Sequence, residues 1–107
     1  MRNRQKLSGI YIIKSNIKPD RFYIGASKDI TARWRCHINS LKYKTHHNKK
    51  LQRHFNKHGL ADLSFKVIEE CKAYDYLLSP KEKYYIQIYK PYFNETVNYL
   101  NINPVLF

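Results

Sequence analysis

The sequence predicts an α+β fold in which a small sheet is covered by helices, in the order β-β-α-α-β-α. Two segments rich in β-forming residues stand near the N-terminus and are joined by a short turn. Two segments with apolar residues at helical spacing follow them, and then come a further strand and a last helix. The 107 residues suffice for one compact domain and are too few for two, so we expect a single domain over residues 1–107.

The first two strands are predicted from residue type and from the turn between them. Residues 8–14 and 21–26 consist largely of Ile, Tyr and Phe, which favour strands. Asn16, Pro19 and Asp20 mark the connection as a turn. A connection this short favours an antiparallel hairpin.

Residues 28–42 are predicted to form the first helix. Its apolar residues Ile30, Trp34, Ile38 and Leu41 recur at helical spacing and define the side that packs on the sheet.

Residues 47–58 are predicted to form the second helix, with Leu51 and Phe55 facing inward. Gly59 follows as a stop signal, because glycine readily adopts the left-handed conformation that ends a helix. Residues 63–70 alternate between apolar and polar types in their first half and predict the third strand.

The last helix is predicted to open at Ser79 and to run to about Tyr89. Ser79 and Glu82 have the spacing of a capping box, and Pro80 stands where proline is tolerated in a first helical turn. Residues 91–107 are expected to form an irregular tail.

The net charge of the chain is its first functional clue. Twenty Lys and Arg residues oppose eight Asp and Glu residues, which gives a formal charge of +12. Nine of the basic residues lie between Lys28 and Lys57, where Asp29 is the one acid, and residues 1–7 form a further basic extension. Such a concentration indicates a polyanion partner, most often nucleic acid, with a merely soluble surface as the alternative.

The sequence also bears on the compartment. Cys36 and Cys71 have neither a metal-binding nor a redox spacing, so the chain is expected in a reducing, intracellular compartment. There is no apolar run long enough for a secretion signal, and none approaches the ~20 residues of a membrane span. A membrane partner is therefore not expected.

The two tyrosines of the hairpin are candidates for catalysis. Alternate residues of a strand share a face, so Tyr11 lies with Gly9, and Tyr23 lies with Gly25. A suitable register would place both phenols on one side, where the glycines would let a substrate backbone approach closely. Plain packing of both rings is the alternative.

Arg33 and His37 are four residues apart, which makes them neighbours on one face of the first helix. This face differs from the one that carries Ile30, Trp34 and Ile38. An arginine beside a histidine suits the binding and polarisation of a phosphate, with a solvated helical surface as the alternative.

Metal-assisted phosphodiester cleavage needs at least one carboxylate for a hard cation. Glu82 is the acid placed firmly inside a predicted helix, although the capping box offers a structural explanation for it. Since no Asp-x-Asp motif or close acid pair suggests two bound metals, a single metal ion is the simpler expectation. The pairs His46–His47 and His54–His58 are expected to be partly exposed or in contact with phosphate.

Taken together, these residues resemble the GIY-YIG nuclease family. The resemblance covers residues 8 to about 100. Within the family, the chain is similar to the catalytic domains of phage homing endonucleases, and residues 51–59 are similar to a segment found in those domains. It is carried by the two triplets and four later residues in order: Gly9-Ile10-Tyr11, Tyr23-Ile24-Gly25, Arg33, His37, Glu82 and Asn98.

The resemblance implies a three-stranded antiparallel sheet flanked by helices. It also implies hydrolysis of DNA phosphodiester bonds with one Mg²⁺ ion, or alternatively Mn²⁺. By position, Tyr11 would activate the attacking water as general base, and Tyr23 would orient water or phosphate. Glu82 would ligate the metal, and Asn98 would support the site.

The same resemblance implies that Arg33 would stabilise the charge on the phosphate in the transition state. His37 and His46 would assist proton transfer or position the substrate. Five further basic residues are expected to contact DNA: Lys28, Arg35, Lys49, Lys50 and Arg53.

Relatives of the homing type carry a linker and a separate DNA-binding domain after the catalytic domain. A chain that stops at Phe107 is therefore expected to be either a catalytic domain alone or a small nuclease of low sequence specificity. Two other functions stay open at this point: a non-catalytic nucleic-acid-binding module on the same fold, and a protein whose basic helix binds an acidic partner. The oligomeric state is also left open.

Overall fold

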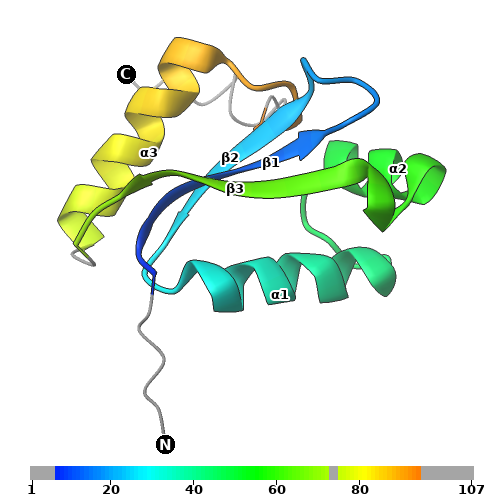
Figure 1. Cartoon of the computed structure of the whole chain (residues 1–107), viewed down its shortest axis with the longest axis horizontal. Helices are drawn as coiled ribbons and strands as arrows, with labels where there is room; N and C mark the ends of the chain where they lie inside the picture. The colour runs from blue at the N-terminus through cyan, green and yellow to red at the C-terminus, as the bar shows by residue number, and fades with distance from the viewer. Residues whose placement is uncertain (1–6, 73–74, 95–107) are drawn as a thin grey trace, which may run out of the picture.

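The computed structural model describes residues 7–72 and 75–94, with the backbone alone for residues 75–79. It has the predicted α+β class and element order (Figure 1), with three antiparallel strands in the spatial order β2-β1-β3. The elements are β1 Gly9–Ser15, β2 Phe22–Ser27, α1 Ile30–Lys42, α2 Lys49–His58, β3 Leu63–Glu70 and α3 Asp75–Tyr89, with short 3-10 helices η1 Leu60–Asp62 and η2 Tyr92–Asn94. No helix in the described part of the chain is long and apolar enough to cross a membrane.

Helices cover both faces of the sheet, α1 and α2 on one side and α3 on the other (Figure 1). The α1/α2 face carries the larger core, in which Tyr11, Ile13 and Tyr23 pack with apolar residues of both helices and of η2. On the α3 face, Ile10 and Ile24 are buried against side chains that include those of α3. We call these two surfaces the α1/α2 face and the α3 face.

The strand register decides which side chains share the α1/α2 face. Tyr11 pairs with Gly25, and Ile13 pairs with Tyr23. Because paired residues of an antiparallel ladder point to the same side, both tyrosines project onto one face, which the sequence had made conditional on the register. Their ring centroids are 6.4 Å apart.

The two glycines of the hairpin make room for atoms of the protein itself, while the close approach of a substrate stays a prediction. A Cβ on Gly25 would overlap the phenol end of Tyr11, so the glycine makes room for that ring. Gly9 has φ +153°, and a Cβ there would overlap the backbone carbonyl of Glu69. The irregularity in the β1–β3 register lies beside it, between Ile10 and Tyr11.

The first two helices begin at polar caps. The side chain of Asp29 accepts a hydrogen bond from the backbone N–H of Ala32, and α1 starts at Ile30. Asn48 in the same way accepts from Leu51 and starts α2. Both helices therefore start two residues later than predicted, because the cap residue itself lies outside the helix.

The predicted start of the last helix is wrong. The helical backbone begins at Asp75, so Ser79 lies inside α3 and is not its N-cap, and Pro80 is an interior residue. The Ser-Pro pair is a local start signal, and here it lies inside a helix that begins four residues earlier, at Asp75. The capping-box explanation for Glu82 is thereby removed.

The tail expected to be irregular is ordered at its beginning. Pro91 and Phe93 are buried, and η2 places Phe93 in the core of the α1/α2 face. The amide of Asn94 accepts a hydrogen bond from the backbone N–H of Ile24 (2.7 Å) and donates one to its carbonyl (2.9 Å). Asn98 lies outside the described residues.

Candidate active site

His37 faces the sheet, which corrects the face assigned to it from sequence. The buried residues of α1 are Ile30, His37 and Leu41, and only 2% of His37 is exposed. Ile38, expected on the inner stripe, is only half-buried. Ile30, His37 and Leu41 are spaced i, i+7 and i+11, which also places them on one face of a helix. His37 can be buried on this face because a phenol on the sheet supplies a hydrogen-bond partner.

Three buried side chains form a continuous hydrogen-bonded chain from the sheet to the loop before α2. The hydroxyl of Tyr11 lies 2.7 Å from Nε2 of His37, and Nδ1 of His37 lies 2.7 Å from Nε2 of His46. Nδ1 of His46 accepts a hydrogen bond of 3.0 Å from the backbone N–H of Asn48. We call these residues the imidazole chain.

The backbone N–H at the end of the imidazole chain sets the direction of every bond in it. Because Asn48 donates to Nδ1 of His46, a neutral His46 carries its proton on Nε2. That proton is donated to Nδ1 of His37, so a neutral His37 in turn carries its proton on Nε2. His37 therefore donates to the phenol oxygen of Tyr11, and the hydroxyl proton of Tyr11 is left to point elsewhere.

Both imidazoles are held neutral by their surroundings. Burial, followed by the positive charge of Arg33, lowers the pKa of His37 to about 3. Burial, followed by the neighbouring His47, lowers the pKa of His46 to about 4. At neutral pH, the directions of the hydrogen bonds derived above therefore hold.

The position of His46 was missed by sequence reasoning. His46 and Gln52 are buried, and the backbone N–H of His46 donates to Oε1 of Gln52 at 3.0 Å. Nε2 of Gln52 donates to the carbonyl of Leu41, which ties α2 to the end of α1. The surface location expected for His46 is wrong, whereas its neighbour His47 is exposed as expected.

Tyr11, Tyr23 and Arg33 act on one another electrostatically. Burial is the main cause that raises the pKa of both phenols; the second cause is Tyr23 for Tyr11 and Glu82 for Tyr23. The guanidinium of Arg33 opposes this and lowers the pKa of each phenol. Both tyrosines are thus neutral at pH 7 and would ionise only with added positive charge nearby.

Glu82 joins this group from α3, which packs against the edge strand β2. Burial raises the pKa of Glu82, and the charge of Arg33 is the main opposing influence. Its carboxylate in turn raises the pKa of Tyr11 and of Tyr23. The four residues therefore lie within electrostatic range of one another.

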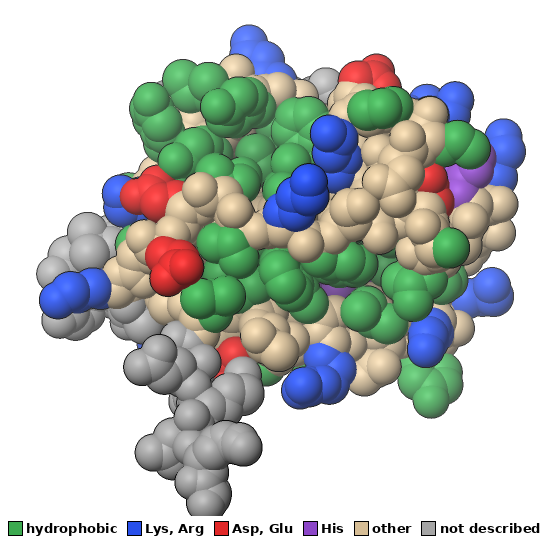
Figure 2. Space-filling model, in the orientation of Figure 1, with side chains coloured by type: hydrophobic (Ala, Val, Ile, Leu, Met, Phe, Trp, Pro, Cys, Tyr) green, Lys and Arg blue, Asp and Glu red, His purple; other side chains and the backbone are tan. Residues whose placement is uncertain are grey.

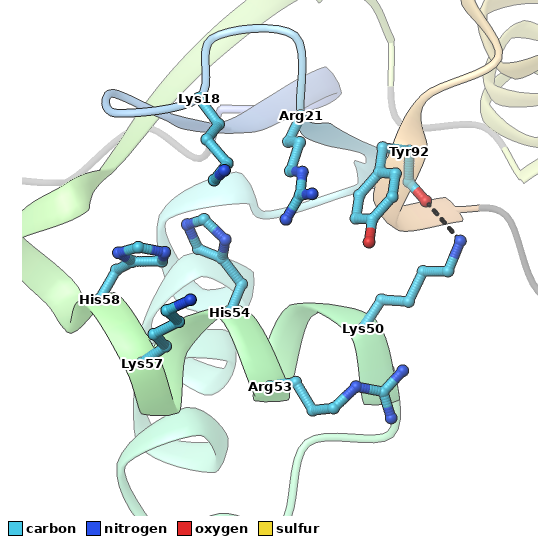
Figure 3. A pocket seen from close by; sticks show the side chains of 8 residues that line it. All are labelled: Lys18, Arg21, Lys50, Arg53, His54, Lys57, His58 and Tyr92. Carbon is cyan, nitrogen blue, oxygen red and sulfur yellow. Dashed lines mark hydrogen bonds between the residues drawn. The ribbon is translucent and has the colours of Figure 1, made fainter.

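The residues expected to bind DNA do not form one cluster. Lys28, Arg35 and Lys49 are exposed. Lys50 and Arg53 line a cavity of about 220 Å³ between α2, the β1–β2 turn and η2 (Figure 3). We call this cavity the basic pocket; five Lys and Arg residues, two histidines and Tyr92 line it.

His54, in the wall of the basic pocket, was expected to be partly exposed. It is 5% exposed, and its Nε2 lies 2.7 Å from Oδ2 of Asp62. Asp62 also accepts hydrogen bonds from Ser15 and from the backbone of Ile17. Hydrogen bonds from His54 and Ser15 lower the pKa of Asp62 to about 2, against the opposing effect of burial, so its carboxylate is ionised.

Comparison with known proteins yields related chains in both sequence and structure. A family model described as the GIY-YIG catalytic domain matches residues 7–98. The intron-associated endonuclease 1 of Enterobacteria phage T4 is 34% identical over 100 residues, which are 94% of this chain and 38% of that protein. The chain thus spans well under half the length of this relative.

Two solved structures share the fold, and both are of the catalytic domain of the intron, or homing, endonuclease I-TevI. A point mutant superposes with a TM-score of 0.74 at 33% identity, covering 78% of this chain and 84% of that one. The other structure gives a TM-score of 0.73 at 34% identity, covering 78% and 88%.

Proposed function

Because the chain belongs to the GIY-YIG family of nuclease catalytic domains, we propose that it hydrolyses DNA phosphodiester bonds with one divalent metal ion, Mg²⁺ or alternatively Mn²⁺. The observation that carries the proposal is the meeting of Tyr11, Tyr23, Arg33 and Glu82, each of which shifts the pKa of others in the group. A packing role for the two tyrosines requires neither the guanidinium nor the carboxylate.

Tyr11 is the proposed general base. A phenol accepts a proton from water only after losing its own, so the site must stabilise the phenolate. His37 supports this because its Nε2–H donates to the phenol oxygen, and Arg33 supports it by its charge. In this proposal His37 is a donor that positions Tyr11 and favours its ionised form. A proton-accepting role for His37 is disfavoured by its pKa of about 3.

Arg33 is the proposed partner of the scissile phosphate. Its side chain is exposed, so it can reach a substrate while its charge still acts on the buried phenols. Guanidinium groups bind two phosphate oxygens at once and stay charged at any physiological pH. Tyr23 lies beside Tyr11 and is proposed to orient the phosphate or the attacking water.

Glu82 is the proposed metal ligand. Among the described residues, no three or more His, Cys, Asp or Glu side chains are grouped to form a metal cage. One half-buried carboxylate fits Mg²⁺, which commonly keeps several waters and takes its remaining ligands from one or two carboxylates and substrate phosphates. When bound, the ion would supply acidification of a water and neutralisation of charge on the phosphate.

Three wider features of the proposal rest on the relatives and on charge. The formal charge of +12 supports a polyanionic substrate, and Lys28, Arg35, Lys49, Lys50 and Arg53 are proposed to contact DNA. His46 is proposed to support the site through His37. We further propose that the chain acts inside the cell, as the catalytic domain of a homing-type endonuclease.

The test is cleavage of supercoiled plasmid with and without Mg²⁺. The variants Arg33→Ala and Glu82→Ala should each lower the rate by about 10²–10³-fold, because each removes a group that stabilises charge in the transition state. Lys42→Ala is the matched control, since Lys42 is an exposed cation at the far end of α1. Undiminished cleavage in both site variants would refute the assignment.

A non-catalytic binding module is the alternative. It would bind DNA in a salt-dependent manner and would not cleave DNA with any divalent metal. The half-buried carboxylate beside two phenols argues against it, because a surface that only binds DNA gains nothing from a negative charge there.

A further inference from the structure

We propose that the basic pocket is a binding site for backbone phosphates of the DNA, separate from the site of cleavage. The inference goes beyond the proposed active site, and it relies on the proposed function only for the identity of the ligand. It is carried by the origin of the pocket's charges, by the state of Tyr92 and by an unpaired nitrogen of His54.

The pocket gathers cations from segments far apart in the sequence. Lys18 and Arg21 come from the β1–β2 turn, and Lys50, Arg53 and Lys57 come from α2. Figure 3 shows Lys18 and Arg21 extending toward α2, and Lys57 extending toward them. Among the residues that the structure describes, no acid lines the cavity. Cations held together in this way repel one another, and an anion between them removes that repulsion.

Tyr92 holds two of these cations in place. The guanidinium carbon of Arg21 and the ammonium nitrogen of Lys50 each lie 4.4 Å from the centroid of its ring, which stands between them in Figure 3. Both faces of the ring are thereby covered, so no base can stack on it. The pocket thus offers charge and hydrogen-bond donors, which suit a phosphate rather than a nucleobase.

His54 provides an independent indication of a ligand. Its Nε2 is bonded to the ionised carboxylate of Asp62, while its Nδ1 is buried and has no hydrogen-bond partner among the described residues. The ring lines the pocket and points toward Lys18 and Arg21 (Figure 3). A buried polar atom without a partner is unfavourable, so a hydrogen-bond donor in the pocket, such as a water on a bound phosphate, would complete this side chain.

The location of the pocket fits a strand that also passes the proposed active site. Arg21 immediately precedes β2, and Tyr23 is two residues further along. Two residues of a strand span about 6.6 Å and place their side chains on the same side. One DNA strand advances about 3.4 Å per nucleotide, so the pocket lies a few nucleotides from the tyrosines. The bound phosphates therefore belong to DNA that flanks the cleaved bond.

Binding without cleavage tests the proposal. Fluorescence anisotropy of labelled duplex DNA in EDTA, over a range of salt concentrations, would compare wild type with the double variant Lys18→Ala/Lys57→Ala. We expect weaker binding to every sequence and a salt slope smaller by about 1–2, as lost phosphate contacts require. Lys66→Ala is the matched control, because Lys66 is an exposed lysine of β3 outside the pocket. An equal change in the control, or no change in the double variant, would overturn the proposal.

A second measurement separates DNA from a free anion. Titration of the ¹⁵N-labelled chain with inorganic phosphate should shift the amides of Arg21 and Lys57, and the double variant should lose these shifts. Shifts with phosphate but an unaltered DNA salt slope would mean that the pocket holds a small anion instead, which contradicts the proposal. If pocket variants weaken DNA binding but the wild type cleaves nothing, the proposed function fails while this inference stands.

Discussion

The two faces of the sheet are built on the same three strands and differ in what they bury. In the described part of the chain, every buried polar side chain belongs to the α1/α2 face, and the imidazole chain is at its centre. On the α3 face, the buried residues Ile10 and Ile24 are apolar, and the polar contacts of Glu69 are partly exposed to solvent. Hydrophobic side chains also gather on the solvent-exposed surface of the α3 region (Figure 2).

The difference shows that a face with buried polar side chains needs hydrogen-bond partners for them. Burying a polar group without a partner is unfavourable by roughly 1–3 kcal/mol. The α1/α2 face avoids this cost for His37 and His46 with a chain that ends on the backbone N–H of Asn48, whereas Nε1 of Trp34 and Nδ1 of His54 are buried without a partner among the described residues. The α3 face avoids the difficulty, since it leaves its charged groups near solvent. The predictions below test this contrast, from the largest expected effect to the smallest.

Removal of one phenol hydroxyl from each face should give opposite results. Tyr11→Phe should lower the cleavage rate by about 10²–10⁴-fold, because the proposed general base is lost. Tyr85→Phe removes a hydroxyl that donates to Glu69 on the α3 face, and cleavage should be unchanged. Single-turnover plasmid cleavage measures both. Equal rates for the two variants would remove the distinction between the faces.

Gly25→Ala should lower the cleavage rate by displacing Tyr11. The new methyl group would overlap the phenol of Tyr11 and push it away from His37. A reacting group displaced by about 1 Å can lose as much as ~10²-fold in rate, so we expect a loss of about 10–10²-fold. Cleavage assays, with circular dichroism to confirm folding, measure this. A fully active Gly25→Ala protein would show that the position of Tyr11 is not critical.

Acidification should destabilise the α1/α2 face through its two histidines. Because the pKa values of His37 and His46 are lowered from 6.5 to about 3 and about 4, the unfolded chain binds protons that the folded chain does not. Their contribution is therefore intact above pH 6.5 and is lost as the pH falls. We expect the free energy of unfolding to drop by about 1–3 kcal/mol between pH 7 and pH 5.

Urea unfolding at both pH values measures this drop. His37→Gln should make the pH dependence shallower whatever it does to stability at pH 7. An unchanged dependence in this variant would mean that His37 is not the group that titrates.

Asn94→Ala should destabilise the edge strand β2. The amide of Asn94 makes both hydrogen bonds to the backbone of Ile24, next to Tyr23. Loss of both should lower the free energy of unfolding by about 1–2 kcal/mol. Asn94→Asp keeps the acceptor but turns a carboxylate oxygen toward the carbonyl of Ile24, so it should be no more stable than alanine. Thermal or urea unfolding would show whether the order holds.

Lys81→Ala should have the smallest effect. Its ammonium lies 2.9 Å from a carboxylate oxygen of Glu69, with about a third of each side chain exposed. Exposed ion pairs of this kind contribute roughly 0–1 kcal/mol and are screened by salt. Unfolding at low and high salt should reveal a small difference at low salt alone. A loss as large as that of Asn94→Ala would mean that the α3 face depends on its polar contacts more than described above.

The hairpin and the third strand could be predicted because their signals are local. β-forming residues, a short turn and a two-residue repeat predicted the strands, and the register of the hairpin then placed both tyrosines on one face. For the same reason, Gly59 was recognisable as the end of α2. The local signal was misleading at Ser79, where a helix start is imitated inside a longer helix.

The errors concern polar residues that are buried. A histidine on a helix looks like a surface residue, and nothing near His37 in the sequence indicates that a phenol from β1 will bond to it. The same holds for His46, Gln52 and His54, whose partners lie on other elements. For Asn94, one sign was available: an amide follows a Tyr-Phe pair in a tail that otherwise looked irregular.

The sequence by itself determined the element order, the family and the residues that can carry chemistry, because periodicity and motif spacing are properties of the chain. Tertiary structure alone decided which of those residues are buried, which nitrogen of each histidine carries the proton, and which lysines share a pocket. The physical reason is that burial and hydrogen bonding are set by partners on other elements. The pKa of His37 and the charge density of the basic pocket exist only once β1, α1 and α2 are packed together.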